Sequence, residues 1–269
     1  MKHQQDLVFN QSNALQSDFC GFKLSISPRK VTQFLLFVVG ILVILSLVSQ
    51  LAVNLLPSFP LGGLRAFIAS KLSVDQEQSF PALYSSISLF FCSILFLIIA
   101  QNKSKTKDKY TLFWKNLFVI FTLLALDELL SFHEYLSNPL RKLGFDGIFH
   151  YAWVIPGFLL VGIFCIVFYR FFQHLPRFMK RCTLLAMLTF IGGAIFVETV
   201  GGYYRYLHGA NSIGYLLIAT TEELMEMIGV IILIHGLLTY LEKMGINKIN
   251  LQLNVSQSHS GNHQPKSQD

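Results

Sequence analysis

The chain has 269 residues, of which 53% are hydrophobic and only 13% are charged, and its formal net charge is +6. A soluble domain of this length carries about a quarter charged residues, so the composition excludes an ordinary water-soluble protein and indicates lipid as the solvent. The positive charge is not interleaved with any nucleic-acid-binding motif, so we expect no nucleic-acid partner.

Long apolar segments recur along the chain and predict an all-α, polytopic integral membrane protein. A helix needs about 20 apolar residues to cross a bilayer, and backbone in lipid must satisfy its own hydrogen bonds. We predict a polar N-terminal tail at 1–30, a disordered, polar C-terminal tail at 244–269, and one transmembrane domain at 31–243 between them. The domain is predicted to be a bundle of six transmembrane helices, at about 33–56, 81–101, 112–133, 151–172, 183–203 and 213–240.

The basic residues predict the orientation of this bundle. Sixteen of the 21 Lys and Arg residues fall in the two tails and in the loops after the second and fourth predicted helices. Because Lys and Arg collect on the cytoplasmic side of a membrane, both termini are predicted to be cytoplasmic. On the outer side, Leu64, Phe67, Ile68 and Leu72 recur at helical spacing, which predicts a short amphipathic helix at the membrane interface.

Acidic residues concentrate near the opposite, outer side. A charge inside the bilayer costs at least about 2.5–3.5 kcal/mol unless it is neutralised or paired, so some of these acids must be protonated, hydrogen-bonded or bound to a cation. With a rise of about 1.5 Å per residue, the acids of the third, fifth and sixth predicted helices fall in one layer. The acids in predicted spans or at their ends are Asp127, Glu128, Glu134, Glu198, Glu222, Glu223 and Glu226.

This layer predicts a site for a divalent metal ion, because carboxylates and imidazoles of helical bundles bind such ions. No other cofactor is indicated. The candidate ligands are Asp127, Glu128, His133, Glu134, Glu222, Glu223 and Glu226, and the candidate supporting residues are Ser131, Glu198 and Arg205.

The geometry of a continuous third helix makes the prediction more specific. If that helix runs unbroken, Asp127, Ser131 and Glu134 share one face, and His133 points about 120° away from Asp127. His133 is then expected to lie off the acidic face. A lone histidine at a helix end is as often a cap as a ligand.

Other polar residues near the site have simpler structural interpretations. Asp75 and Glu77 are expected to cap the second predicted helix, or to form the mouth of the acidic site. Glu198 and Arg205 are expected to form an internal ion pair. The paired glycines at 192–193 and 201–202 are expected to allow close helix packing.

Three stretches carry a resemblance: VDQEQSFPALYSS (Val74–Ser86), LDELLSFHE (Leu126–Glu134) and EELMEMIG (Glu222–Gly229). Together they resemble a family of uncharacterised multi-pass bacterial membrane proteins with no assigned activity. The resemblance implies a location in the bacterial inner membrane, and it supports the acidic residues as a set.

Three functional hypotheses follow from the acidic layer. In the first, a metal bound there serves chemistry on a lipid or small-molecule substrate at the outer leaflet, with the lipid bilayer as a partner. In the second, the protein is a cation- or proton-coupled transporter with the same acids as its coupling site. The apolar cytoplasmic halves of the third and sixth predicted helices weigh against a continuous path. In the third, the protein is a structural membrane subunit whose acids join helices. Whether it is an enzyme is left open.

Overall fold

The computed structural model describes residues 23–25, 27–55, 62–142, 147–210, 212–245 and 248–250, which belong to two units. In the tail unit, β1 (Lys23–Ser25) pairs antiparallel with β2 (Lys248–Asn250). Of the predicted tails, residues 1–22, 26, 246–247 and 251–269 lie outside the described residues, whereas 27–30 and 244–245 belong to the helical unit. The other unit, Ser27–Gly245, is helical and holds the candidate site.

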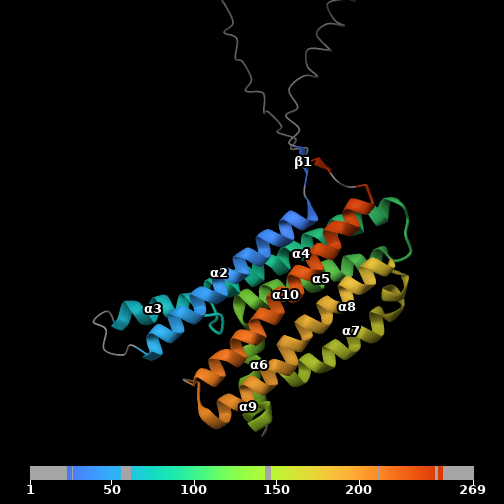
Figure 1. The fold of residues 1–269 in the computed structure, drawn as a ribbon. Helices are drawn as coiled ribbons and strands as arrows, with labels where there is room; N and C mark the ends of the chain where they lie inside the picture. The colour runs from blue at the N-terminus through green and yellow to red at the C-terminus, as the bar shows by residue number, and fades with distance from the viewer. Residues whose placement is uncertain are drawn as a thin grey trace, which may run out of the picture. The chain divides into compact units, whose positions relative to one another are not determined.

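The helical unit confirms the predicted all-α class. Figure 1 shows its elements lying side by side as long helices joined by short connections. They are α2 (Pro28–Leu55), α3 (Gly62–Leu72), α4 (Phe80–Lys105), α5 (Thr111–Leu130), α6 (Phe132–Lys142), η1 (Gly147–Phe149), α7 (Val154–His174), α8 (Arg177–Ile191), η2 (Gly192–Val197), α9 (Glu198–His208) and α10 (Ile213–Lys243).

Five helical stretches of the described chain are long and apolar enough to cross a membrane, which indicates a multi-pass membrane protein. They are Pro28–Val53, Phe80–Lys105, Val154–His174, Arg177–His208 and Ile213–Lys243. The fourth of them joins α8, η2 and α9 into 32 continuous residues. A sixth span at α5, which carries Lys115, Asp127 and Glu128, stays a prediction, as does the orientation of the bundle.

Helix α10 is the centre of the helical unit. It contacts α2, α4, α8, η2 and α9, and Figure 1 shows it running between α2 and α8. Its apolar residues run all round the helix, as expected for a helix with neighbours on most sides. Met227 and Ile231 of α10 pack with Val39 of α2 and Val74. In contrast, α2 and α7 expose many large apolar side chains, which suits contact with lipid.

A glycine lets α8 approach α10 closely. A Cβ added at Gly229 would lie 2.8 Å from the backbone nitrogen of Phe190 and 3.0 Å from the carbonyl oxygen of Ala186, so α8 lies directly against α10.

The short helix expected near 64–72 is α3, which exposes Leu64, Phe67 and Ile68.

Candidate functional site

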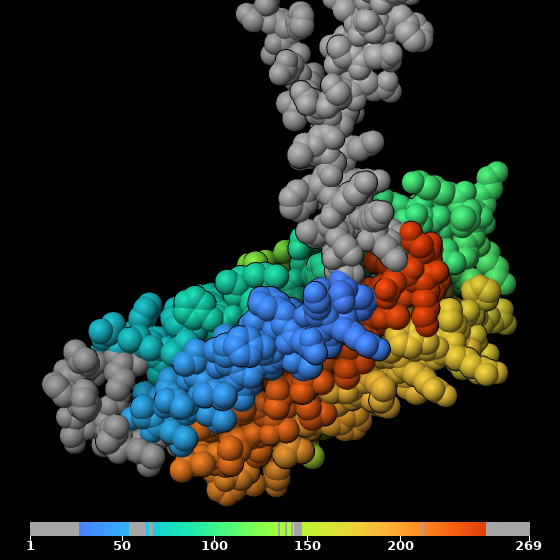
Figure 2. Space-filling model, turned by 45° about the horizontal axis from the view of Figure 1, so that its top comes forward, coloured from blue at the N-terminus to red at the C-terminus, as the bar shows by residue number. Residues whose placement is uncertain are grey.

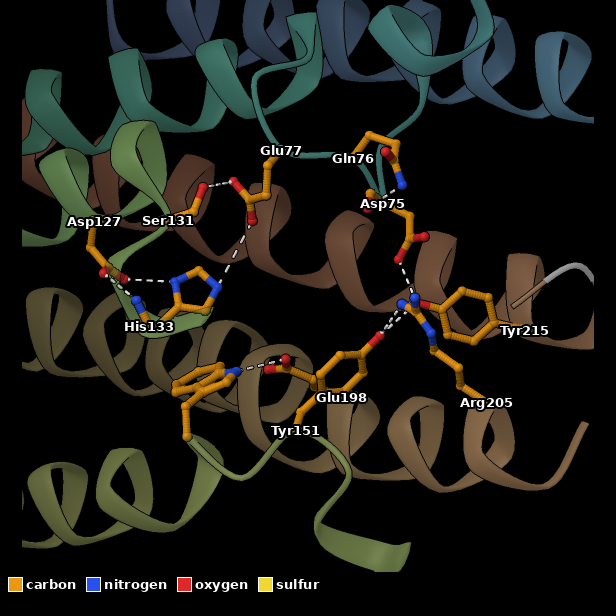
Figure 3. Close-up of polar contacts among 11 residues, drawn as sticks. Asp75, Gln76, Glu77, Asp127, Ser131, His133, Tyr151, Glu198, Arg205 and Tyr215 are labelled. Carbon is orange, nitrogen blue, oxygen red and sulfur yellow. Dashed lines mark hydrogen bonds and ion pairs between the residues drawn. The ribbon is translucent and has the colours of Figure 1, made fainter. Parts of the chain in front are cut away.

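The polar residues of interest gather at one end of the helical unit, where α5 and α9 end and α10 begins; we call it the acidic end. Figure 3 shows that its residues come from α5, α6, α9, α10, the segment before α7 and the α3–α4 loop (residues 73–79). The acidic end therefore combines residues that are far apart in the sequence.

A break between α5 and α6 shapes one side of the acidic end. Helix α5 ends because Ser131 adopts a left-handed backbone conformation, with φ of 56°. The chain turns back, so the backbone N–H of His133 donates to Oδ1 of Asp127 at 3.0 Å, and its ring Nδ1 lies 2.9 Å from Oδ2. Asp127 thus caps the first turn of α6. The prediction that His133 points away from Asp127 is wrong, because the helix on which it depended is interrupted.

The imidazole of His133 is held from several sides. Its Nε2 lies 3.9 Å from Oε1 of Glu77, and its ring centroid lies 4.9 Å from that of Trp153. Helix α6 is outside the candidate spans. Burial alone would lower the pKa of His133, but the hydrogen bond and charge of Asp127, with Glu198 and Glu77, outweigh burial and raise it to about 9. The imidazole therefore carries a positive charge at neutral pH.

The α3–α4 loop connects two parts of the acidic end. Glu77 accepts a hydrogen bond from the hydroxyl of Ser131 at 2.5 Å, and Asp75 accepts one from the hydroxyl of Tyr215 at 2.7 Å. The expectation that Asp75 and Glu77 cap the following helix is wrong, because Ser79 is the cap and accepts from the N–H of Ala82. The two carboxylates instead bind α10 and the α5–α6 junction.

Arg205 and Glu198 each have other partners than expected. Nη1 of Arg205 donates to the hydroxyls of Tyr151 at 2.7 Å and Tyr215 at 3.2 Å. Glu198, which is 8% exposed, accepts from Nε1 of Trp153 at 2.8 Å. Within the described residues no ion pair joins Glu198 to Arg205, so that prediction is wrong. Figure 3 shows Arg205 beside the hydroxyls of Tyr151 and Tyr215, and Glu198 hydrogen-bonded to a single indole.

Three carboxyl groups in the first half of α10, those of Glu222, Glu223 and Glu226, face those of the neighbouring elements. Glu226 interacts electrostatically with Glu128 and Glu198, and Glu222 interacts with Glu198. Glu223 interacts with Glu226 and Glu128. No residue that the structure describes donates a hydrogen bond to Glu128, Glu222, Glu223 or Glu226. These four partly buried carboxyls thus form an acidic cluster, a name used below for them alone.

Two glycines place α10 against the helical stretch that carries Glu198. The η2 segment is a wide π-helical turn, and a Cβ at Gly193 would lie 2.8 Å from the carbonyl oxygen of Glu222 and 3.1 Å from Cγ of Glu226. A Cβ at Gly201 would lie 3.6 Å from Oε2 of Glu222. The expected role of these glycines in close packing is confirmed. π-turns occur often at functional sites.

The predicted divalent-metal site is not supported by this arrangement. Among the described residues, no three His, Cys, Asp or Glu side chains lie so that they could hold a metal ion together. Glu134, one of the candidate ligands, falls in α6, but its side chain lies outside the described part of the chain. The other candidates, as far as the structure describes them, share no common coordination centre.

Sequence reasoning missed the two tyrosines that hold Arg205. Neither Tyr151 nor Tyr215 is among the candidate residues that the sequence indicates. The spacing of Tyr215 offered a signal, because it lies seven residues before Glu222 and therefore on the same face of α10. Tyr151 offered none, since it lies outside any regular helix.

Residues 35–241 match the family described as Domain of unknown function (DUF8692). No curated protein and no solved structure matches the chain.

Proposed function

We propose, from the premise that this chain belongs to the DUF8692 family of unknown function, that it is a multi-pass membrane protein whose acidic cluster takes up and releases protons, as the coupling site of a cation- or proton-coupled transporter. The observation that carries the proposal is the set of four carboxyls, from α5 and α10, without hydrogen-bond donors among the described residues.

The electrostatic cost of the acidic cluster supports this function. Four unpaired carboxylates in a membrane interior would cost about 10 kcal/mol or more, which is comparable to the whole stability of a domain. Like charges that face one another add to the cost, so the cluster must bind protons or another cation. A proton satisfies one carboxyl at a time and needs no common coordination centre.

The surroundings of the cluster support exchange with one side of the membrane. The α3–α4 loop is hydrogen-bonded to two parts of the acidic end: Asp75 accepts from Tyr215 of α10, and Glu77 accepts from Ser131 at the α5–α6 junction. Glu77 in turn interacts with Glu226 and lies near His133, so titratable groups continue from the cluster to the loop. By the distribution of Lys and Arg, we propose that this side is the outer one.

Exchange of Glu226 for Gln is expected to remove a titrating carboxyl and to slow proton uptake. In proteoliposomes with a pH-sensitive dye inside, the variant is expected to take up protons about tenfold more slowly after an external acid step, equivalent to about 1.4 kcal/mol in the barrier. Infrared spectra recorded during a pH titration are expected to lose one protonated-carboxyl signal, because the amide cannot titrate.

The matched control is Glu242→Gln, an exposed glutamate at the other end of the same helix. It is expected to behave as the unaltered protein in both measurements. Equal proton uptake by Glu226→Gln and Glu242→Gln, or an unchanged infrared signal in Glu226→Gln, would contradict the proposal.

A second candidate function rests on His133, which Asp127 orients through two hydrogen bonds. An imidazole fixed by a carboxylate is a general acid–base group, suited to chemistry on a lipid or small molecule at the membrane surface. This candidate predicts that His133→Gln abolishes turnover of the substrate while the infrared titration of the acidic cluster persists.

A further inference from the structure

A cavity of about 160 Å³ lies at the other end of the helical unit from the acidic cluster. We call this the basic end; α4, α7 and α10 end there, and α5 and α8 begin there. Figure 2 shows the green, yellow and red segments of these elements gathered at one edge of the molecule. The cavity is lined by Lys103, Asp108, Tyr110, Trp114, Phe171, His174, Leu175, Pro176 and Tyr240.

The floor of the cavity is aromatic. Trp114, which is 2% exposed, packs edge-on against Phe171 with ring centroids 5.0 Å apart, and stacks on Tyr240 at 5.6 Å. These contacts come from three different helices, α5, α7 and α10. The floor is therefore closely packed and largely apolar, and it suits the glycerol and upper acyl region of a lipid.

The rim of the cavity carries donors and positive charge. Lys103 pairs with Asp108 at 3.0 Å, and the N–H of Tyr110 donates to the same carboxylate at 2.8 Å. An ammonium has three donors, so Lys103, with Asp108 and Tyr240 as partners, keeps one for a ligand. Lys109 lies over the Tyr110 ring at 4.8 Å, and the His174 ring lies 4.5 Å from that of Tyr110.

The wider surface of the basic end has the same sign of charge. Exposed basic residues lie on the turns next to the cavity. They outnumber the acids of the described residues at this end, which are Asp108 and Glu242. Basic cavities between transmembrane helices at a membrane surface bind anionic lipid headgroups. The basic residues on these turns are Lys105, Lys107, Lys115, Arg170, Arg177, Lys180, Arg181 and Lys243.

We propose that this cavity binds the phosphate headgroup of an anionic phospholipid, with Lys103, Lys109 and His174 around the phosphate and the aromatic floor beneath its glycerol. The position at the ends of the apolar helices favours a lipid over a soluble phosphate, because headgroups lie at that level of a membrane. The site is separate from the acidic cluster and does not depend on its function.

Tryptophan fluorescence can test the site directly, because the chain has two tryptophans and Trp114 lines the cavity. Trp153→Phe is carried in every protein of the series, so that Trp114 is the sole tryptophan. In nanodiscs of phosphatidylcholine, brominated phosphatidylglycerol is expected to quench Trp114 at about a fivefold lower mole fraction than brominated phosphatidylcholine does. Equal quenching by the two brominated lipids would overturn the proposal.

Two variants locate the binding at the cavity. Lys109→Gln, at the exposed rim, is expected to raise the required mole fraction of phosphatidylglycerol about fivefold. Lys109 is chosen because its ammonium lies over the ring of the lining residue Tyr110. Lys30→Gln, an exposed lysine in the first turn of α2, an element that contributes no residue to the cavity, is expected to change it less than about twofold. Equal effects of the two variants would indicate a general surface charge and would overturn the proposal. If inorganic phosphate alone prevented brominated phosphatidylglycerol from quenching Trp114, the ligand would be a soluble phosphate, and the proposal would be overturned.

Discussion

Replacing Gly193 by leucine is expected to destabilise the protein by about 3 kcal/mol, the upper range for overpacking a tight interface. The first atom of the new side chain would lie 2.8 Å from the carbonyl oxygen of Glu222, and Cβ of Met225 is only 3.2 Å away. A backbone carbonyl of α10 cannot rotate aside as a side chain can. The η2 turn must therefore move away from α10, and thermal unfolding in detergent is expected to show the loss.

Gly40 provides the matched control for this substitution. It lies in α2, and a Cβ added there meets no atom within 4 Å. Gly40→Leu is expected to leave the free energy of unfolding unchanged or to raise it by up to about 1 kcal/mol, because the added side chain meets no atom and leucine is a better helix former than glycine. If Gly193→Leu were as mild as Gly40→Leu, the close packing of η2 on α10 would be wrong. The positions of Glu222 and Glu226 beside Glu198 would then be wrong as well.

The stability of the protein is expected to fall as the pH rises from about 6.5 to about 9, through the titration of His133. The folded state raises the pKa of this imidazole from 6.5 to about 9, so it binds the proton more tightly than the unfolded state does. The stabilisation is fully present below about pH 6.5 and is lost as the pH passes the folded pKa. Its size is about 3 kcal/mol at most.

Asp127→Asn is expected to remove most of this pH dependence, because the asparagine lacks the charge that holds the proton on His133. The groups around the imidazole are Asp127, Glu77, Glu128 and Glu198, and only the first is changed. The measured quantity is the difference in unfolding free energy between the unaltered protein and the variant at each pH. His208→Asn, on the exposed end of α9, is expected to keep the full dependence. A difference between the Asp127 variant and the unaltered protein that does not vary with pH would contradict the assignment.

Apolar length was enough to predict most of the helices. The runs that end near 56, 101, 172 and 240 correspond to α2, α4, α7 and α10, because a segment in lipid must form its own hydrogen bonds. The predicted fifth span corresponds to α8, η2 and α9 together. Periodicity alone could not show the π-turn at Gly192–Val197, since that turn depends on the packing of Gly193 against α10.

The candidate site was predicted as a set of residues and not as an arrangement. Rise per residue placed Glu128, Glu198 and Glu222 in one layer, and the structure brings Glu198 within electrostatic range of Glu222. The partners of Glu77 and Arg205 were not predictable, because they are chosen by loops and by helices far away in the sequence.

The sequence by itself determined that this is a helical membrane protein with its buried acids toward one end, since composition, apolar length and helical rise depend only on the order of residues. The tertiary structure alone decided how those acids are held. The left-handed turn at Ser131 reverses the chain, so that His133 returns to Asp127 and reaches toward Glu77. No periodicity extends through such a turn, because it ends the helix on which the periodicity is measured.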